Sequence, residues 1–121
     1  MTCSVLVVDD DPEFQRLAEP MLAVFGFAVV GRAETVHSAI QAAGELRPDA
    51  VLVDVGLPDG DGIVLAGTLA ALPWQPRVVL TSTSAYAAGP TEVRRSHAEA
   101  FIPKEQLPNA ALDCLLGGRA P

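Results

Sequence analysis

The sequence predicts an α/β domain in which five parallel β-strands, each followed by an α-helix, form one open, doubly wound sheet with helices on both faces. Short apolar runs rich in β-branched residues alternate with Ala- and Leu-rich stretches. These runs are nearly continuous, as is typical of parallel strands buried on both faces. The 121 residues, 50% of them hydrophobic, suffice for a single core. We therefore expect residues 1–121 to form one domain with its core between about residues 4 and 117.

The elements follow in order along the chain. The strands are predicted at Val5–Val8, Phe27–Val30, Ala50–Val53, Val78–Leu80 and Ala100–Ile102. The first helix is predicted over Pro12–Phe25, because Asp11 suits the N-cap and proline suits the first helical position. The later helices are predicted from Glu34 or Thr35 to Leu46, and over Gly62–Leu72, Pro90–Ala98 and Pro108–Leu116. The fourth helix is expected to be short, because a helix can begin after Gly89 at Pro90 but is not expected to run through Pro90 from an earlier residue.

The composition excludes several classes of function. The 15 acidic and 8 basic residues give a net charge of −7, which opposes direct binding to nucleic acid. The sequence has no apolar run long enough for a membrane span and no signal-peptide pattern. We expect a soluble, cytoplasmic protein with no membrane partner. The chain also carries no helix-turn-helix pattern after the domain, which favours a stand-alone role.

Polar residues follow the predicted strands at the edge where open parallel sheets bind ligands. They are Asp9, Asp10 and Asp11 after the first strand, Asp54 after the third, Thr81, Ser82 and Thr83 after the fourth, and Lys104 after the fifth. The fold therefore predicts that several carboxylates, a hydroxyl and one ammonium group meet at a single edge. Unpaired charges would not gather there for packing reasons, because their burial is costly.

This set of groups favours phosphoryl chemistry with a metal ion. Clustered carboxylates are typical ligands of Mg²⁺, which also offsets their mutual repulsion. A carboxylate such as Asp54, placed between a cation and Lys104, can act as a nucleophile and form an aspartyl-phosphate. Lys104 and the Thr81 hydroxyl could then stabilise the transferred group. Asp11 is more simply a helix cap, and Asp59 and Asp61 suit local backbone bonds in a Gly-rich turn.

From Val5 to about Leu116, the chain resembles the receiver domain of two-component response regulators. The four motifs that carry the resemblance, in family order, are VVDDD (7–11), DVGLPDGDG (54–62), LTS (80–82) and FIPK (101–104). The resemblance implies a flavodoxin-like (βα)5 fold with strand order 2-1-3-4-5. It also implies a phosphoacceptor signalling domain, one that catalyses only its own phosphorylation and dephosphorylation.

The resemblance assigns a role to each site residue. The phosphoacceptor is Asp54, Mg²⁺ is held by Asp9, Asp10, Asp54 and the backbone carbonyl of Gly56, the lysine is Lys104, and the switch residues are Thr81 and Phe101. The phosphoryl donor would be a sensor histidine kinase or a phosphotransfer protein. Phosphorylation would then change the surface of helix four, strand five and helix five, which binds an output protein that the sequence does not name. A phosphorylation-dependent homodimer is a further expected partner.

Two departures from the common family pattern bear on these expectations. The lysine is usually followed by proline, whereas here Pro103 precedes Lys104 and Glu105 follows it. In addition, Gly56 and Thr83 occupy positions whose side chains often influence the attacking water. Because neither offers an acid or amide to orient that water, we hypothesise a long-lived phosphorylated state.

Three other functions stay open at this point. A phosphatase of the haloacid dehalogenase type would use Asp9-x-Asp11, Thr81 and Lys104, but it needs a later acidic pair and gives Asp54 no task. A degenerate receiver would act only through protein–protein contact, which does not explain the complete set of acidic, hydroxyl and lysine residues. A third reading makes the chain the receiver part of a longer transcription factor.

Overall fold

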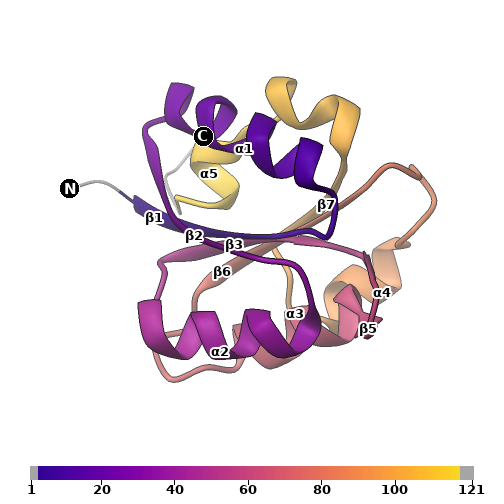
Figure 1. The fold of residues 1–121 in the computed structure, drawn as a ribbon. Helices are drawn as coiled ribbons and strands as arrows, with labels where there is room; N and C mark the ends of the chain where they lie inside the picture. The colour runs from indigo at the N-terminus through magenta and orange to yellow at the C-terminus, as the bar shows by residue number, and fades with distance from the viewer. Residues whose placement is uncertain (1–2, 118–121) are drawn as a thin grey trace.

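The computed structural model describes residues 3–117, so the two ends of the predicted domain, residues 1–2 and 118–121, lie outside the described residues. The elements in chain order are β1 (Cys3–Val8), α1 (Pro12–Val24), β2 (Phe27–Ala33), α2 (Val36–Leu46), β3 (Ala50–Asp54), β4 (Gly56–Leu57), β5 (Gly60–Asp61), α3 (Gly62–Ala70), β6 (Arg77–Ser82), α4 (Pro90–Arg95), β7 (Ala100–Pro103), the 3₁₀ helix η1 (Lys104–Asn109) and α5 (Leu112–Leu115) (Figure 1). Within the described range, none of the helices has the length and apolar character needed to cross a bilayer.

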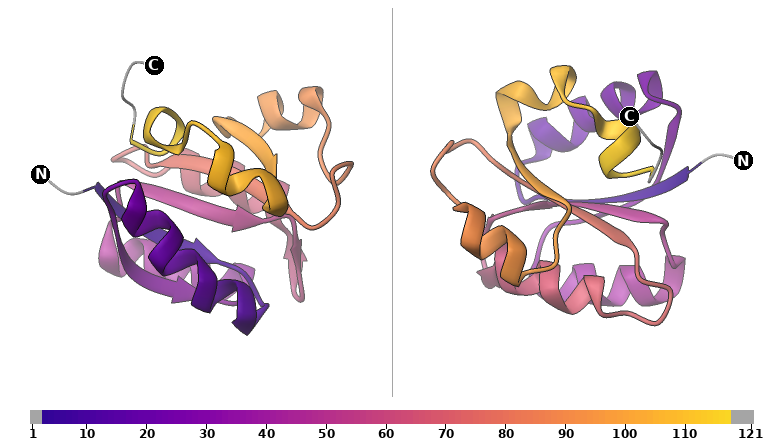
Figure 2. Two further views of the ribbon diagram at one scale, coloured as in Figure 1. Left: turned by 90° about the horizontal axis from the view of Figure 1, so that it is seen from above. Right: turned by 180° about the vertical axis from the view of Figure 1, so that it is seen from behind.

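The large sheet confirms the predicted architecture. Its five strands are all parallel and lie in the order β2-β1-β3-β6-β7. Because β6 and β7 are the fourth and fifth strands of this sheet, the order is the predicted 2-1-3-4-5. Helices α1 and α5 cover one face with η1, whereas α2, α3 and α4 cover the other (Figures 1 and 2). The doubly wound, flavodoxin-like fold is therefore present.

The core consists of two apolar layers separated by the sheet. One layer lies under α1 and α5 and includes Leu22, Leu52 and Leu116, and the other lies under α2 and α3 and includes Leu6 and Leu65. Strand β3 lies in the middle of the sheet, and all five of its residues are buried. This burial explains its continuous apolar sequence and holds Asp54, its last residue, at the edge of a rigid scaffold.

The predicted starts of the first two helices are confirmed by their caps. The Glu13 backbone N–H donates to the Asp11 side chain at 3.0 Å, and Pro12 occupies the first position of α1. Thr35 and Ser38 cap α2 reciprocally. Helix α4 ends at Arg95, earlier than predicted.

The predicted fifth helix over Pro108–Leu116 is wrong. The chain instead enters the 3₁₀ helix η1 directly after β7, and α5 is a single turn that starts at Leu112. Leu107 is fully buried, and the N–H of Ala110 donates to its carbonyl at 3.2 Å. A residue before proline avoids the α conformation, so Pro108 favours this tighter, interrupted path.

The loop after Asp54 contains a short hairpin of β4 and β5 that was not predicted. Asp61 makes the predicted local bond, since it caps α3 by accepting the Ile63 N–H at 2.8 Å. The prediction of local bonds for Asp59 is wrong. Its carboxylate accepts the N–H groups of Val36 and His37, at 2.7 and 3.1 Å, because the hairpin carries it to the open N-terminus of α2. Asp59 thus ties the loop after Asp54 to α2.

Candidate functional site

Three carboxylates meet where β1 and β3 end. These strands pair in parallel, with Val8 beside Val53, so the residues that follow them emerge at the same edge of the sheet. Asp9, Asp10 and Asp54 each offer one oxygen, and these oxygens all lie within 4.8 Å of one another. Asp9 and Asp54 are buried, and Asp10 is exposed. The arrangement fits a hard cation that takes oxygen ligands and keeps some of its water.

The Asp9 carboxylate is engaged on both oxygens. Its Oδ1 accepts the Asp11 backbone N–H at 2.9 Å, and its Oδ2 lies 2.7 Å from Nζ of Lys104. The Lys104 side chain is only 14% exposed. Lys104 therefore lies at the predicted edge of the sheet. Its ion pair there is with Asp9, which is the neighbour of Asp54.

The surroundings of Asp54 make its carboxyl group a weaker acid than usual. Burial, and after it the negative charge of Asp9, raise the pKa of Asp54 from 3.8 to about 6, although the positive charge of Lys104 opposes the rise. Asp10 adds to the rise, and a hydrogen bond from the Gly56 backbone lowers it. The negative charge of such a carboxylate is not fully neutralised by its neighbours, which favours binding of a cation or reaction with an electrophile.

The hydroxyl of Thr81 is held by the neighbouring strand. Thr81 pairs with Asp54 in the sheet and is fully buried, and its Oγ1 donates to the Ile102 carbonyl at 2.6 Å. Phe101 is partly buried and packs against the apolar layer under α2 and α3. Gly56 lies in β4 at the exposed start of the hairpin. The predicted residues therefore surround one edge, although the Thr81 hydroxyl is turned to β7.

Sequence reasoning missed two residues that support this edge. Gln15 is buried, and its amide nitrogen donates to the carbonyls of Val7, Asp9 and Ala33 at 3.0–3.2 Å. This amide fixes the end of β1 from which the aspartates project. The helical spacing of Gln15 with Ala18 and Leu22 on the buried face of α1 was a readable signal.

The second missed residue is Phe14, whose ring centroid lies 4.4 Å from Nζ of Lys104. No signal in the sequence pairs residues 14 and 104, because their contact depends on how α1 lies against the end of β7.

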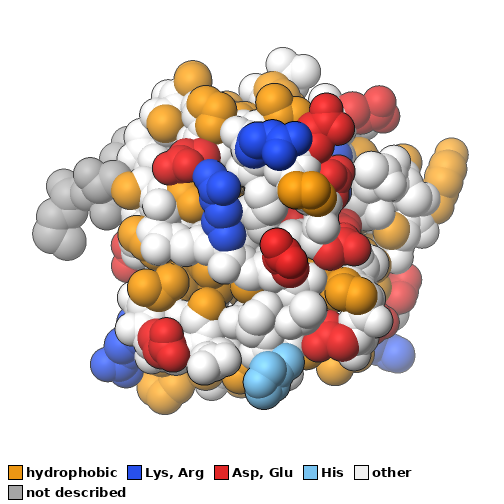
Figure 3. All heavy atoms as spheres, in the orientation of Figure 1, with side chains coloured by type: hydrophobic (Ala, Val, Ile, Leu, Met, Phe, Trp, Pro, Cys, Tyr) orange, Lys and Arg blue, Asp and Glu red, His pale blue; other side chains and the backbone are white. Residues whose placement is uncertain are grey.

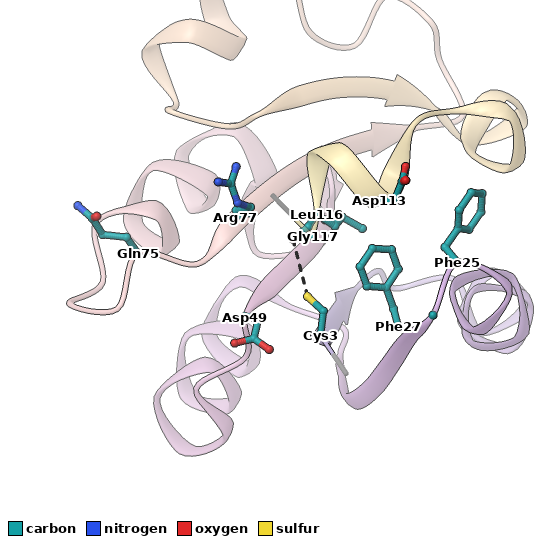
Figure 4. A pocket seen from close by; sticks show the side chains of 10 residues that line it. Cys3, Phe25, Phe27, Asp49, Gln75, Arg77, Asp113, Leu116 and Gly117 are labelled. Carbon is teal, nitrogen blue, oxygen red and sulfur yellow. Dashed lines mark hydrogen bonds between the residues drawn. The ribbon is translucent and has the colours of Figure 1, made fainter. Parts of the chain in front are cut away.

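One pocket lies at the opposite end of the sheet. Cys3, Phe27 and Asp49 are among its lining residues, and the Cys3 Sγ–H donates to the Leu116 carbonyl at 3.8 Å (Figure 4). None of the predicted site residues lines it.

The sequence of the chain matches the family model described as the response regulator receiver domain over residues 5–115. The chain belongs to this family. The receiver domain is a signalling domain and not a classical enzyme. The match covers every motif around the carboxylate edge, from the aspartates after β1 to Lys104.

Two relatives of similar length match most or all of the chain. The chain is 28% identical over 104 residues to the chemotaxis protein CheY of Bacillus subtilis, covering 86% of this chain and 87% of CheY. The response regulator domain of Thermotoga maritima CheB superposes with a TM-score of 0.82 at 26% identity, and each chain is fully covered.

Other relatives are longer. The chain is 41% identical over 78 residues to the transcriptional regulatory protein KdpE of Mycobacterium tuberculosis, covering 64% of this chain but 34% of KdpE. The chain spans between 34% and 49% of the length of the first curated relatives that it matches. The similarity is therefore to the receiver part of those proteins.

Proposed function

We propose that this receiver domain accepts a phosphoryl group on Asp54 from a phosphohistidine, with Mg²⁺ as cofactor. The observation that carries the proposal is the cluster of Asp9, Asp10 and Asp54 with Lys104 at one edge of the sheet. The donor is a sensor histidine kinase or a phosphotransfer protein. In the transfer, an Asp54 oxygen bonds to phosphorus while the P–N bond breaks, and the donor imidazole keeps the bonding electrons and takes up a proton.

The residues around Asp54 divide the work. Asp9, Asp10, Asp54 and the Gly56 carbonyl hold Mg²⁺, which when bound offsets negative charge on the phosphoryl oxygens. Because the Asp54 pKa is about 6, this carboxyl is mostly ionised at pH 7 and can attack. Lys104 starts in its ion pair with Asp9 and turns to a phosphoryl oxygen on Asp54, which supplies positive charge where charge accumulates.

Phosphorylation then biases a switch. The Thr81 hydroxyl leaves the Ile102 carbonyl to bond a phosphoryl oxygen, and Phe101 turns inward into the space that Thr81 vacates. These two residues lie on the neighbouring strands β6 and β7, so the change reaches the surface of α4, β7, η1 and α5. That surface binds the output protein or a second phosphorylated copy, and the phosphoryl group shifts a pre-existing equilibrium by its differential contacts.

The longer relatives include transcriptional regulators, and their DNA binding is not assigned to these 121 residues. The net charge of −7 opposes contact with a polyanion. The face in Figure 3 agrees, because its Lys and Arg side chains stand among Asp and Glu side chains and form no broad basic patch.

We expect Mg²⁺ to raise the melting temperature, because the ion relieves repulsion among Asp9, Asp10 and Asp54 and binds only the folded chain. At a concentration about 100 times its dissociation constant, a ligand of this kind adds roughly 2.7 kcal/mol, or several degrees. Thermal denaturation with EDTA and with MgCl₂ at equal ionic strength measures the effect. An equal rise in the variant Asp10→Asn would show that the ion acts elsewhere.

We also expect the phosphorylated state to persist for minutes or longer, because Gly56 has no side chain to orient an attacking water. The loss of the adduct after donor removal, followed by intact mass, gives the half-life. Gly56→Asn should shorten that half-life by supplying an amide. A wild-type half-life of seconds would refute the hypothesis.

One experiment separates the proposed function from the alternatives. The protein is incubated with Mg²⁺ and either acetyl phosphate or a phosphate monoester such as p-nitrophenyl phosphate. We expect up to one phosphoryl group per chain from acetyl phosphate and no sustained hydrolysis of the monoester. Steady turnover of the monoester would support the phosphatase, and no adduct from acetyl phosphate would support a degenerate receiver.

A further inference from the structure

The Lys104 ammonium group has a second neighbour besides Asp9, namely the face of an aromatic ring on α1. Its Nζ lies 2.7 Å from Asp9 Oδ2 and 4.4 Å from the centroid of Phe14. An ammonium group at this distance over a ring face is attracted by the ring quadrupole, and more strongly where water is excluded. We propose that Phe14 is a positioning residue, which holds Lys104 at the carboxylate edge for phosphoryl transfer to Asp54.

The ring can hold the lysine because the ring itself is fixed. Phe14 lies in the first turn of α1, whose start is set by the Asp11 cap and Pro12. Its side chain is partly buried and packs against the apolar layer that includes Leu107 and Leu112. The lysine stem, in contrast, has four rotatable carbons and loses much entropy when it is confined. The fixed Phe14 ring therefore restricts the flexible side chain of Lys104.

The ring matters most when Mg²⁺ is bound, and in this respect the inference rests on the proposed function. Asp9 is then a ligand of the ion as well as the partner of Lys104. A cation bound to Asp9 neutralises part of its charge and repels the ammonium, so the ion pair weakens. The attraction to the Phe14 face does not depend on the charge of Asp9. The ring therefore keeps Lys104 near Asp54 when Asp9 binds the metal ion and its ion pair with Lys104 is weakened.

This role is distinct from packing and has a spectroscopic signature. A ring face beside Nζ shifts the neighbouring methylene protons of Lys104 upfield by its ring current. We expect this shift in wild type with and without Mg²⁺, its loss in Phe14→Leu, and its retention in Phe14→Tyr. The matched control is Met21→Ala, which loses packing in the same apolar layer from a later turn of α1 and should leave the Lys104 shift unchanged.

The kinetic test uses the full chain with Mg²⁺ and acetyl phosphate. Phe14→Leu should slow the formation of the Asp54 adduct about three- to tenfold, as expected for loss of one cation–π contact, and Phe14→Tyr should restore the rate. Met21→Ala should react at the wild-type rate below its melting temperature. A Lys104 shift that survives in Phe14→Leu, or a wild-type rate in that variant, would overturn the inference. If wild type itself forms no adduct, the proposed function fails, while the chemical shifts still decide whether Phe14 orders Lys104.

Discussion

Replacing Asp54 with asparagine should stabilise the metal-free protein at neutral pH. The ionised Asp54 carboxylate is buried beside Asp9, which is why its pKa is raised to about 6. Asparagine keeps the shape and removes the charge. The shift from 3.8 to about 6 corresponds to at most about 3 kcal/mol, and solvent screening at the edge of the sheet reduces this figure, so we expect Asp54→Asn to melt a few degrees higher than wild type in EDTA at pH 7.5.

The gain should depend on pH in one direction. The folded Asp54 has the higher pKa, so between about pH 4 and 6 the folded state holds more protons than the unfolded state. The contribution of Asp54 to stability therefore falls as the pH rises through that window and stays low above it. We expect the difference between Asp54→Asn and wild type to be near zero at pH 4 and to reach its full size above pH 6.5.

The control for this measurement is Asp113→Asn, which makes the same change in net charge at an exposed position on α5. It should show no comparable gain. Urea denaturation across pH 4–8 measures all three proteins. An Asp54→Asn variant that is less stable than wild type at pH 7.5 in EDTA would contradict the electrostatic account of the site.

Replacing Gly62 with alanine should cost about 3 kcal/mol, because the site has no room for a methyl group at this position. Gly62 is buried at the start of α3, and its N–H donates to the Val55 carbonyl at 2.8 Å. A Cβ there would meet the backbone oxygen of Asp54 and the Cα of Val55 well inside contact distance. The end of strand β3, where Asp54 lies, would have to move to make room for the methyl group. The variant should therefore also form the Asp54 adduct more slowly.

The matched control is Gly44→Ala within helix α2, where an added Cβ meets nothing within 4 Å. Alanine in an open helical position stabilises by about 0.5–1 kcal/mol, so the two Gly→Ala changes should have opposite signs. Chemical denaturation of both variants and of wild type measures the two changes in the free energy of unfolding. A Gly62→Ala variant as stable as wild type would show that the backbone of residue 62 does not need to lie as close to the Asp54 carbonyl as the structure places it.

The strand ends show why much of the site could be predicted from the sequence. Parallel strands bring their carboxyl ends to one edge, so knowing where β1, β3 and β7 end was enough to place Asp9, Asp54 and Lys104 together. Asp11 was also predictable, because its capping bond to Glu13 is local. These predictions needed only the period of the apolar pattern and the handedness of the connections.

The features that escaped prediction depend on contacts between distant segments. Asp59 caps α2 because an unpredicted hairpin carries it there, and Phe14 meets Lys104 because α1 lies beside the end of β7. The choice of Asp9 as the partner of Lys104 likewise follows from side-chain geometry. Pro108 marked a helix start by rule, but the burial of Leu107 in η1 overrode it.

The account rests on Asp54 as the phosphoacceptor, and one measurement tests this most directly. Wild type and Asp54→Asn are incubated with MgCl₂ and acetyl phosphate, their intact masses are recorded, and the adduct is located by peptide mapping. We expect wild type to gain one phosphoryl group on Asp54 and the variant to gain none. An adduct on another residue, or equal labelling of the variant, would contradict the central claim.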